Sequence, residues 1–414
     1  MPKSASGPSA IVDPFQRDAD LVARQIRERF IPVIEARCGG SPRAHEVADA
    51  FKVHRKLGWQ LWNVAYGEEP LLSLQYMPSA HGIRVWHQAA ANCGVADDLL
   101  AGLLETATRF EELVSTHAQD RDQFEMMLGA CEAQRDEQTD ERWRKQSFMG
   151  NSYVWGVRAK TYFTLLMLHP SARNGFFDMA RVHGLLGLVR TRPNVRWPFA
   201  QSVVYSAEDE RHPMRAPLLE SEATRATGVP LLEPFCSQPL PAVQRRVGQM
   251  GMLEDELLPG AMGETGESTI FTGEALREVA PIYQTEPDEN AMFGTGVRTP
   301  SALLIYDHLV HHALFPETER RLRVYSELIS PVTRDERDLL PVPEKVEHLG
   351  RGGRRLRTAE VPRYQEMMDV ICERLGWKLE DFEHYRVRMR YPPMPTAVMV
   401  EHDLPAVPAG FSLD

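Results

Sequence analysis

The spacing of the apolar residues changes along the chain, and this change limits the folds that the chain can adopt. Between Leu21 and Ile34 the apolar residues recur at intervals of three and four, which is typical of one helix face. From His384 to Tyr391 the apolar side chains instead alternate with arginines, which is typical of a β-strand. The sequence therefore predicts an α+β fold, with a mostly helical N-terminal half and a mixed C-terminal half.

Composition excludes several classes of protein. The 414 residues include 47 basic and 58 acidic side chains, and a net charge of −11 excludes a protein that coats nucleic acid with its whole surface. The five cysteines form no CxxC pair, so we expect neither a disulfide framework nor a structural zinc knuckle. Because no signal-peptide pattern and no apolar run of about 18 residues is present, we expect a cytoplasmic protein without a membrane partner.

The most informative segment is SPRAHEVADAFKVHRKLGWQLW, from Ser41 to Trp62, which predicts two short helices joined by a tight turn. It resembles the helix-turn-helix of DNA-binding proteins. Ala48 stands where that superfamily has a small residue at the helix crossing. Two positions depart from the pattern: Lys52 replaces the usual glycine of the turn, and Gly58 replaces a common β-branched core residue.

The resemblance implies that the second helix enters the major groove of duplex DNA with its N-terminal residues. Between Leu21 and Gln60 the chain carries eight basic and four acidic side chains, a local net charge of +4 that suits phosphate contacts. Arginine and lysine can also donate to guanine edges, and glutamine can read adenine. The predicted DNA-binding residues are Arg43, His54, Arg55, Lys56 and Gln60. The alternative is a three-helix element that only packs on the rest of the protein.

A second cluster, Asp307-His308-Leu309-Val310-His311-His312, concentrates imidazoles. The sequence allows a helix over residues 303–315, on which His308 would share a face with His311 or His312. Such spacing can hold zinc or iron, although the glutamate of an HExxH motif is missing and a third ligand would have to come from elsewhere. The alternative is a set of surface histidines on an amphipathic helix.

These patterns predict four regions: a disordered tail (1–12), a helix-turn-helix-like domain (13–70), a helical region (71–190) that includes a helix over 151–168, and an α+β domain (191–414). The leading hypothesis is a DNA-binding transcription regulator that forms homo-oligomers and has no catalytic residue and no cofactor. Its C-terminal domain would sense a small-molecule effector or mediate assembly. The open alternatives are an enzyme with a metal or histidine site in the C-terminal half, and a structural or self-assembling protein. The tryptophans are expected to anchor the core.

Overall fold

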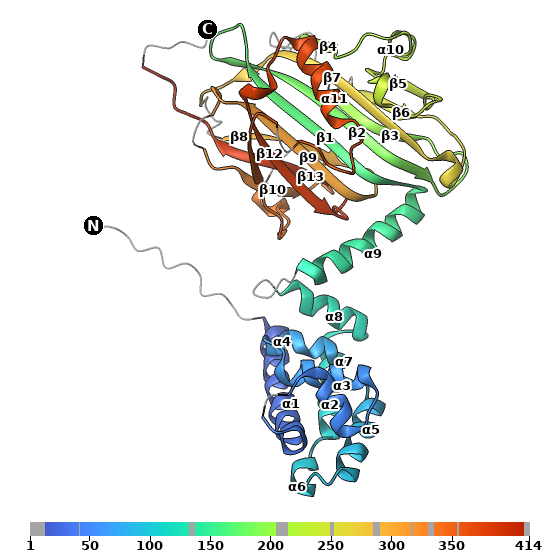
Figure 1. Cartoon of the computed structure of the whole chain (residues 1–414), viewed down its shortest axis with the longest axis vertical. Helices are drawn as coiled ribbons and strands as arrows, with labels where there is room; N and C mark the ends of the chain where they lie inside the picture. Colours follow the sequence, from blue (N-terminus) through green and yellow to red (C-terminus); the bar gives the residue numbers. More distant parts are fainter. Residues whose placement is uncertain are drawn as a thin grey trace. The chain divides into compact units, whose positions relative to one another are not determined.

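The computed structural model describes residues 13–40, 42–131, 137–203, 214–248, 252–284, 290–315, 318–329, 335–353 and 356–409. The predicted disordered tail, residues 1–12, lies outside these ranges. The chain forms two compact units, Met1–Asp140 (unit 1) and Glu141–Asp414 (unit 2). The α+β class is confirmed, because the described part of unit 1 is helical and that of unit 2 is mostly strands (Figure 1).

Unit 1 is built from eight α-helices in the part of it that the structure describes. They are α1 (Pro14–Cys38), α2 (Ala44–Phe51), α3 (Arg55–Tyr66), α4 (Pro70–Ser73), α5 (Ala80–Asn92), α6 (Asp97–Leu100), α7 (Glu105–His117) and α8 (Arg121–Ala130). Asp13 caps α1 by accepting a hydrogen bond from the backbone N–H of Phe15 at 2.8 Å. The helix continues past Pro32 and ends before Gly39.

One apolar core joins these helices. Trp86 of α5 is fully buried and contacts Phe30 of α1 and Phe51 of α2 edge to face, with ring centroids 4.8 and 6.0 Å apart. Leu128 of α8 belongs to the same buried cluster as Phe15 of α1. The expected division of the N-terminal region near residue 70 is therefore not observed, since residues on both sides of it share this core.

In its described residues, unit 2 forms three β-sheets and three α-helices. Its strands are β1 (Val157–Pro170), β2 (Phe176–Arg190), β3 (Trp197–Val203), β4 (Met214–Pro217), β5 (Val243–Val247), β6 (Met252–Leu257), β7 (Ser268–Pro281), β8 (Asn290–Val297), β9 (Ser301–His311), β10 (Arg321–Ser326), β11 (Glu347–Arg351), β12 (Phe382–Arg390) and β13 (Thr396–Asp403). Its helices are α9 (Glu137–Trp155), which begins just before the boundary, α10 (Glu222–Thr227) and α11 (Tyr364–Leu375).

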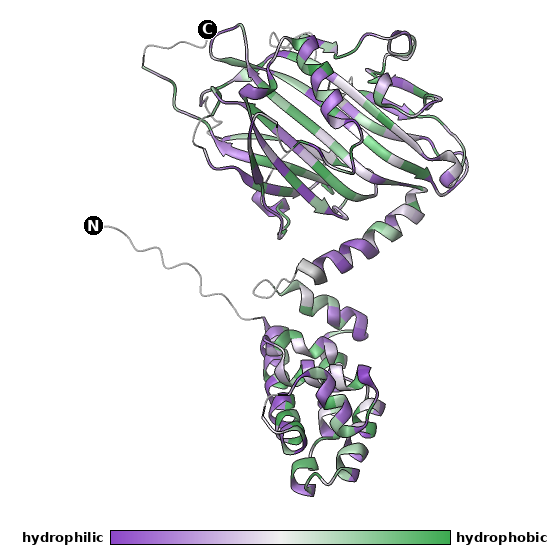
Figure 2. Cartoon of the chain, viewed as in Figure 1, coloured by the Kyte–Doolittle hydropathy of each residue, from purple (hydrophilic) through white to green (hydrophobic). Residues whose placement is uncertain are grey.

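The largest sheet has seven strands in the order β11-β12-β9-β1-β2-β7-β4, and the two three-stranded sheets have the orders β10-β13-β8 and β3-β6-β5. In the large sheet β1 and β9 are parallel, and the other pairs are antiparallel. Hydrophobic residues, green in Figure 2, run along its central strands, whereas α9 is mostly hydrophilic. This sheet therefore forms the centre of unit 2.

The two faces of the large sheet are covered differently. Helix α11 lies across one face (Figure 1), where Tyr364 packs edge to face on Phe163 of β1 with ring centroids 5.1 Å apart. On the other face Tyr162 of β1 donates a hydrogen bond to the Gly296 carbonyl of β8 at 2.6 Å, and His183 of β2 stacks on Phe199 of β3. Both small sheets therefore pack against the face opposite α11.

The boundary expected near residue 190 lies earlier, because the helix predicted over 151–168 was wrong. Helix α9 ends at Trp155, Gly156 takes a positive φ of 75°, and β1 begins at Val157. The central residues of β1 are buried on both faces of the sheet. A strand of this kind has a continuous apolar run, which periodicity alone does not distinguish from a buried helix.

Among the helices in the described part of the chain, none combines the length and the apolar character that a bilayer crossing requires.

Candidate functional site

The turn between α2 and α3 has the geometry of a tight helix–helix corner. Lys52 adopts the left-handed conformation, with φ 55° and ψ 39°, at the C-terminus of α2. The backbone N–H of Val53 then donates to the Ala48 carbonyl at 3.0 Å. A lysine therefore occupies a conformation that glycine adopts at lower cost.

Helices α2 and α3 cross at very short range. A Cβ atom placed on Gly58 would lie 2.5 Å from the Cβ of Ala48, which is closer than two side chains can approach. Gly58 and Ala48 are both buried, as is Leu61 one turn later on α3. This crossing is possible because Gly58 has no side chain. The close approach therefore explains why position 58 holds a glycine and not the β-branched residue that is common in the helix-turn-helix pattern.

Four of the five predicted DNA-binding residues lie at the start of α2 or of α3, and Gln60 lies further along α3. Arg43 precedes α2, and its backbone N–H donates to Glu46 at 2.6 Å. His54 caps α3, since its Nδ1 accepts from the Lys56 backbone N–H at 3.2 Å, so this histidine has a structural role. Arg55 and Lys56 are exposed, as is Arg43.

The outward face of α3 continues one turn further. Gln60 is half-buried, and Trp59 beside it is 46% exposed and contacts Tyr76 edge to face at 5.0 Å. The tryptophans were expected in the core, and the exposed Trp59 departs from that expectation. Its position, one turn after Arg55 on the exposed side of an amphipathic helix, was the available signal.

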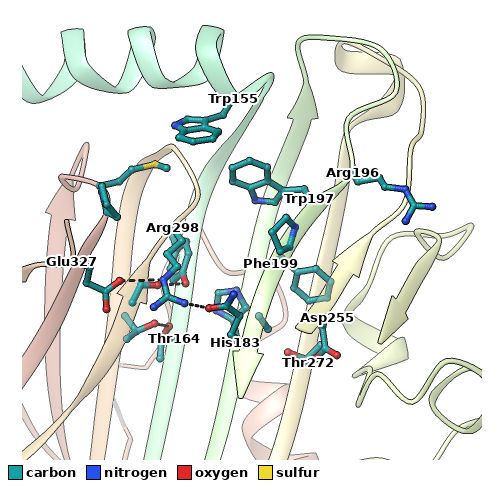
Figure 3. Close-up of a pocket in the computed structure, with 18 of the residues that line it drawn as sticks. Trp155, Thr164, His183, Arg196, Trp197, Phe199, Asp255, Thr272, Arg298 and Glu327 are labelled. Atoms are coloured by element: carbon teal, nitrogen blue, oxygen red, sulfur yellow. Dashed lines mark hydrogen bonds and ion pairs between the residues drawn. The ribbon is translucent and has the colours of Figure 1, made fainter. Parts of the chain in front are cut away.

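A second candidate site lies in unit 2, where a cavity of about 960 Å³ separates the seven-stranded sheet from the two small sheets. One wall comes from β1, β2 and β7, and the other comes from β3, β6 and β8. Figure 3 shows Trp155 and Trp197 together at the end of the cavity nearest α9. A cavity of this size can enclose a drug-sized molecule.

Among the described residues, three carboxylates line the cavity, and each is paired with an arginine. The pairs are Asp255–Arg245, Glu274–Arg181 and Glu327–Arg298, with N–O distances of 2.6, 2.8 and 3.1 Å. Burial raises the pKa of Asp255 above its usual value, although the hydrogen bonds from Arg245 oppose this effect. Arg298 also donates to Gln201 of β3, and it thereby links the two small sheets across the cavity (Figure 3).

His183 adds a neutral polar group to the same wall. Burial lowers the pKa of His183 to about 4, and the nearby Arg181 lowers it further, so the imidazole is uncharged at neutral pH. Tyr162 contacts the ring edge to face at 4.7 Å, and Phe199 stacks on it. Among the described residues, no group forms a hydrogen bond with the buried Nε2 atom of His183.

The three histidines predicted as metal ligands do not converge. Residues 301–311 form strand β9, so the helix expected over 303–315 was wrong. His308 and His311, three positions apart on a strand, point to opposite faces of the sheet. His308 is 1% exposed, whereas His311 is partly exposed and His312 is exposed beyond the end of the strand.

A different triad forms instead. His311, His312 and Asp381 offer ligand atoms that lie within 4.8 Å of one another. However, Nη2 of Arg351 lies 2.7 Å from Nδ1 of His312 and 3.8 Å from the Asp381 carboxylate. A guanidinium at this distance competes with a metal cation for both groups. We therefore assign no metal site to this triad.

The residues that line the cavity were not among those predicted from the sequence. Tyr162 and Thr164 fell in the segment expected to be a helix, and Trp155 was assigned to the core although it is 47% exposed. The available signal was the alternation of Arg181 and His183 with apolar residues, which is typical of a strand with one polar face.

Comparisons with known proteins give no family for this chain. No family model matches it, and neither does any curated protein sequence. Among solved structures it is similar to the crystal structure of a "putative protease" from Parabacteroides distasonis ATCC 8503. That match has 7% identity and a TM-score of 0.29, and it covers 60% of this chain and 41% of that chain, so it carries no argument about fold or function.

Proposed function

We propose that the protein is a DNA-binding transcription regulator in which α2, the turn and α3 form a helix-turn-helix. The observation that carries this proposal is the contact of Gly58 with Ala48 across the left-handed turn at Lys52. In a helix-turn-helix the second helix crosses closely over a small residue near the centre of the first, and Gly58 and Ala48 make a crossing of this kind.

The chemistry of the outward face supports the same function. Arg55 and Lys56 are exposed in the first turn of α3, the part of a recognition helix that meets base edges and phosphates. Arg43 is exposed at the start of α2, where it can contact the phosphate backbone. Gln60 follows on α3 and can form two hydrogen bonds with adenine. We assign no catalytic residue and no cofactor to this function.

The remaining parts of the proposal follow from this mode of binding. Helix-turn-helix proteins commonly bind as dimers on half-sites one helical turn apart, so we propose a homo-oligomer. A regulator of this type acts on chromosomal DNA, and we propose a cytoplasmic location. Unit 2 would then serve as the sensing or assembly part of the protein.

The test compares two pairs of charge deletions by fluorescence anisotropy with labelled duplex DNA. Arg55→Ala combined with Lys56→Ala should weaken binding by roughly 1–3 kcal/mol and should lower the salt dependence by about one unit of slope for each lost phosphate contact. Arg17→Ala combined with Arg24→Ala removes the same charge from exposed positions on α1 and should change binding little.

Gln60→Ala separates base reading from charge. Because glutamine is neutral, this variant should relax the sequence preference found by selection from a random duplex library without changing the salt slope. The proposal is wrong if the wild-type protein does not bind duplex DNA at low salt. It is also wrong if the α1 control weakens binding as much as the α3 pair does.

A further inference from the structure

One basic side chain that lines the cavity of unit 2 is not neutralised by a carboxylate. Each of its carboxylates is paired with an arginine, as described above. Arg196, which also lines the cavity, pairs with Glu256, whereas the exposed Arg192 has no ion-pair partner among the described residues. The lining therefore offers a positive charge that is available to an incoming anion.

Aromatic surface lies beside this arginine. A Cβ atom on Gly156, the residue after Trp155, would lie 2.6 Å from Nε of Arg192, so the arginine sits against the end of α9. Trp155 is 47% exposed and meets the buried Trp197 edge to face, with ring centroids 6.3 Å apart. A half-exposed indole in a cavity wall offers a face on which a planar ring can stack.

The interior of the cavity supplies a neutral polar contact. His183 is uncharged at neutral pH, and its Nε2 atom lacks a hydrogen-bond partner among the described residues. A buried nitrogen without a partner is costly, and a polar group of a ligand can remove that cost directly or through a bound water molecule.

We infer that this cavity binds a small organic anion with a planar ring, which stacks on Trp155 while its anionic group pairs with Arg192. The charged groups around His183 are already paired with one another, which favours a ligand whose charge stays at the end of the cavity near α9. This inference does not depend on DNA binding by unit 1, since all of the residues that carry it belong to unit 2.

Two fluorescent probes test the inference on the full-length protein. Anilinonaphthalene sulfonate carries a planar naphthalene ring and an anionic sulfonate, and N-phenylnaphthylamine is its neutral counterpart. Arg192→Gln should weaken binding of the anionic probe by roughly three- to tenfold, as expected for the loss of one partly exposed charge contact, and should leave the neutral probe unchanged within about twofold. Trp155→Ala should weaken both probes by at least about threefold, because both need the ring surface.

Matched controls separate the cavity from other apolar surface. Tyr153→Ala removes an aromatic ring that is 81% exposed on the same helix but does not line the cavity. Arg374→Gln removes an exposed charge from α11, on the opposite face of the large sheet. Neither control should change the affinity for either probe.

The inference is overturned if Tyr153→Ala weakens binding as much as Trp155→Ala, or if Arg192→Gln affects both probes equally. It is also overturned if the wild-type protein binds neither probe.

Discussion

Arg386 of β12 donates two hydrogen bonds to Asp307 of β9, at 2.7 and 2.6 Å, and the two residues face each other directly across the strand pair. Tyr364 of α11 donates to the same carboxylate at 2.5 Å, and Asp307 is fully buried. Burial alone would raise the pKa of Asp307, but the contacts with Arg386 and His384 hold it below its usual value. This network therefore fixes an ionised carboxylate beneath α11.

Breaking this ion pair from one side should destabilise unit 2. Arg386→Met leaves the Asp307 carboxylate buried without its strongest partner, and we expect a loss of roughly 3–5 kcal/mol in the free energy of unfolding. Combining Asp307→Leu with Arg386→Met should cost less than either single change, because no unpaired charge remains. Urea unfolding followed by far-ultraviolet circular dichroism measures both effects. A loss below about 1 kcal/mol for Arg386→Met would contradict a structural role for the pair.

Gly58→Ala should destabilise unit 1, although alanine is the better helix former. The added methyl group meets Ala48, and we expect a cost of roughly 1–3 kcal/mol as the helices move apart. Gly150→Ala on α9 is the matched control, because a Cβ atom there meets nothing within 4 Å and should stabilise by up to about 1 kcal/mol. Differential scanning calorimetry of both variants makes the comparison. Stabilisation by Gly58→Ala would mean that the close crossing does not exist.

The stability of unit 2 should fall as the pH drops from about 6.5 toward 5. Burial lowers the pKa of His402 to about 3 and that of His183 to about 4. Both residues titrate near 6.5 when unfolded, so below that pH the unfolded chain binds more protons than the folded chain does. The expected loss by pH 5 is roughly 1–2 kcal/mol for each histidine.

Unfolding in urea at several pH values measures this dependence, and His402→Gln should reduce its slope. The lowered pKa of Asp307 acts in a separate range, because its contribution is lost only below the pKa of an unfolded aspartate, at about 4. An unchanged slope in the His402→Gln protein would show that this histidine binds protons equally in the folded and unfolded states.

Several elements could be predicted from the sequence because local features specify them. The two helices predicted between Ser41 and Trp62 appear as α2 and α3. Helix α11 ends before Gly376, whose left-handed conformation is one that glycine adopts at low cost. Strand β12 was visible because its apolar residues alternate with arginines. Periodicity and helix caps act within a few residues, so the sequence contains this information directly.

The strands at the centre of unit 2 could not be predicted from local periodicity in the same way. Strands β1 and β9 are buried on both faces, so their residues lose the alternation that marks a half-exposed strand, and both segments were expected to be helices. The histidine spacing that suggested a metal site depended on that mistaken helix. Arg386, which alternation alone would place at a surface, is buried because Asp307 lies opposite it.

The sequence by itself determined the α+β class, the helices of unit 1 and the positions of its charged residues, because these depend on neighbours within a turn or a strand. Only the tertiary structure decided that Gly58 meets Ala48, that Lys52 takes a left-handed conformation, and that Trp155 and Arg192 line one cavity. The contact of Gly58 with Ala48 and the shared cavity join residues from separate elements, and Lys52 must turn the chain so that α2 and α3 can meet; this packing is set by the whole core rather than by local spacing.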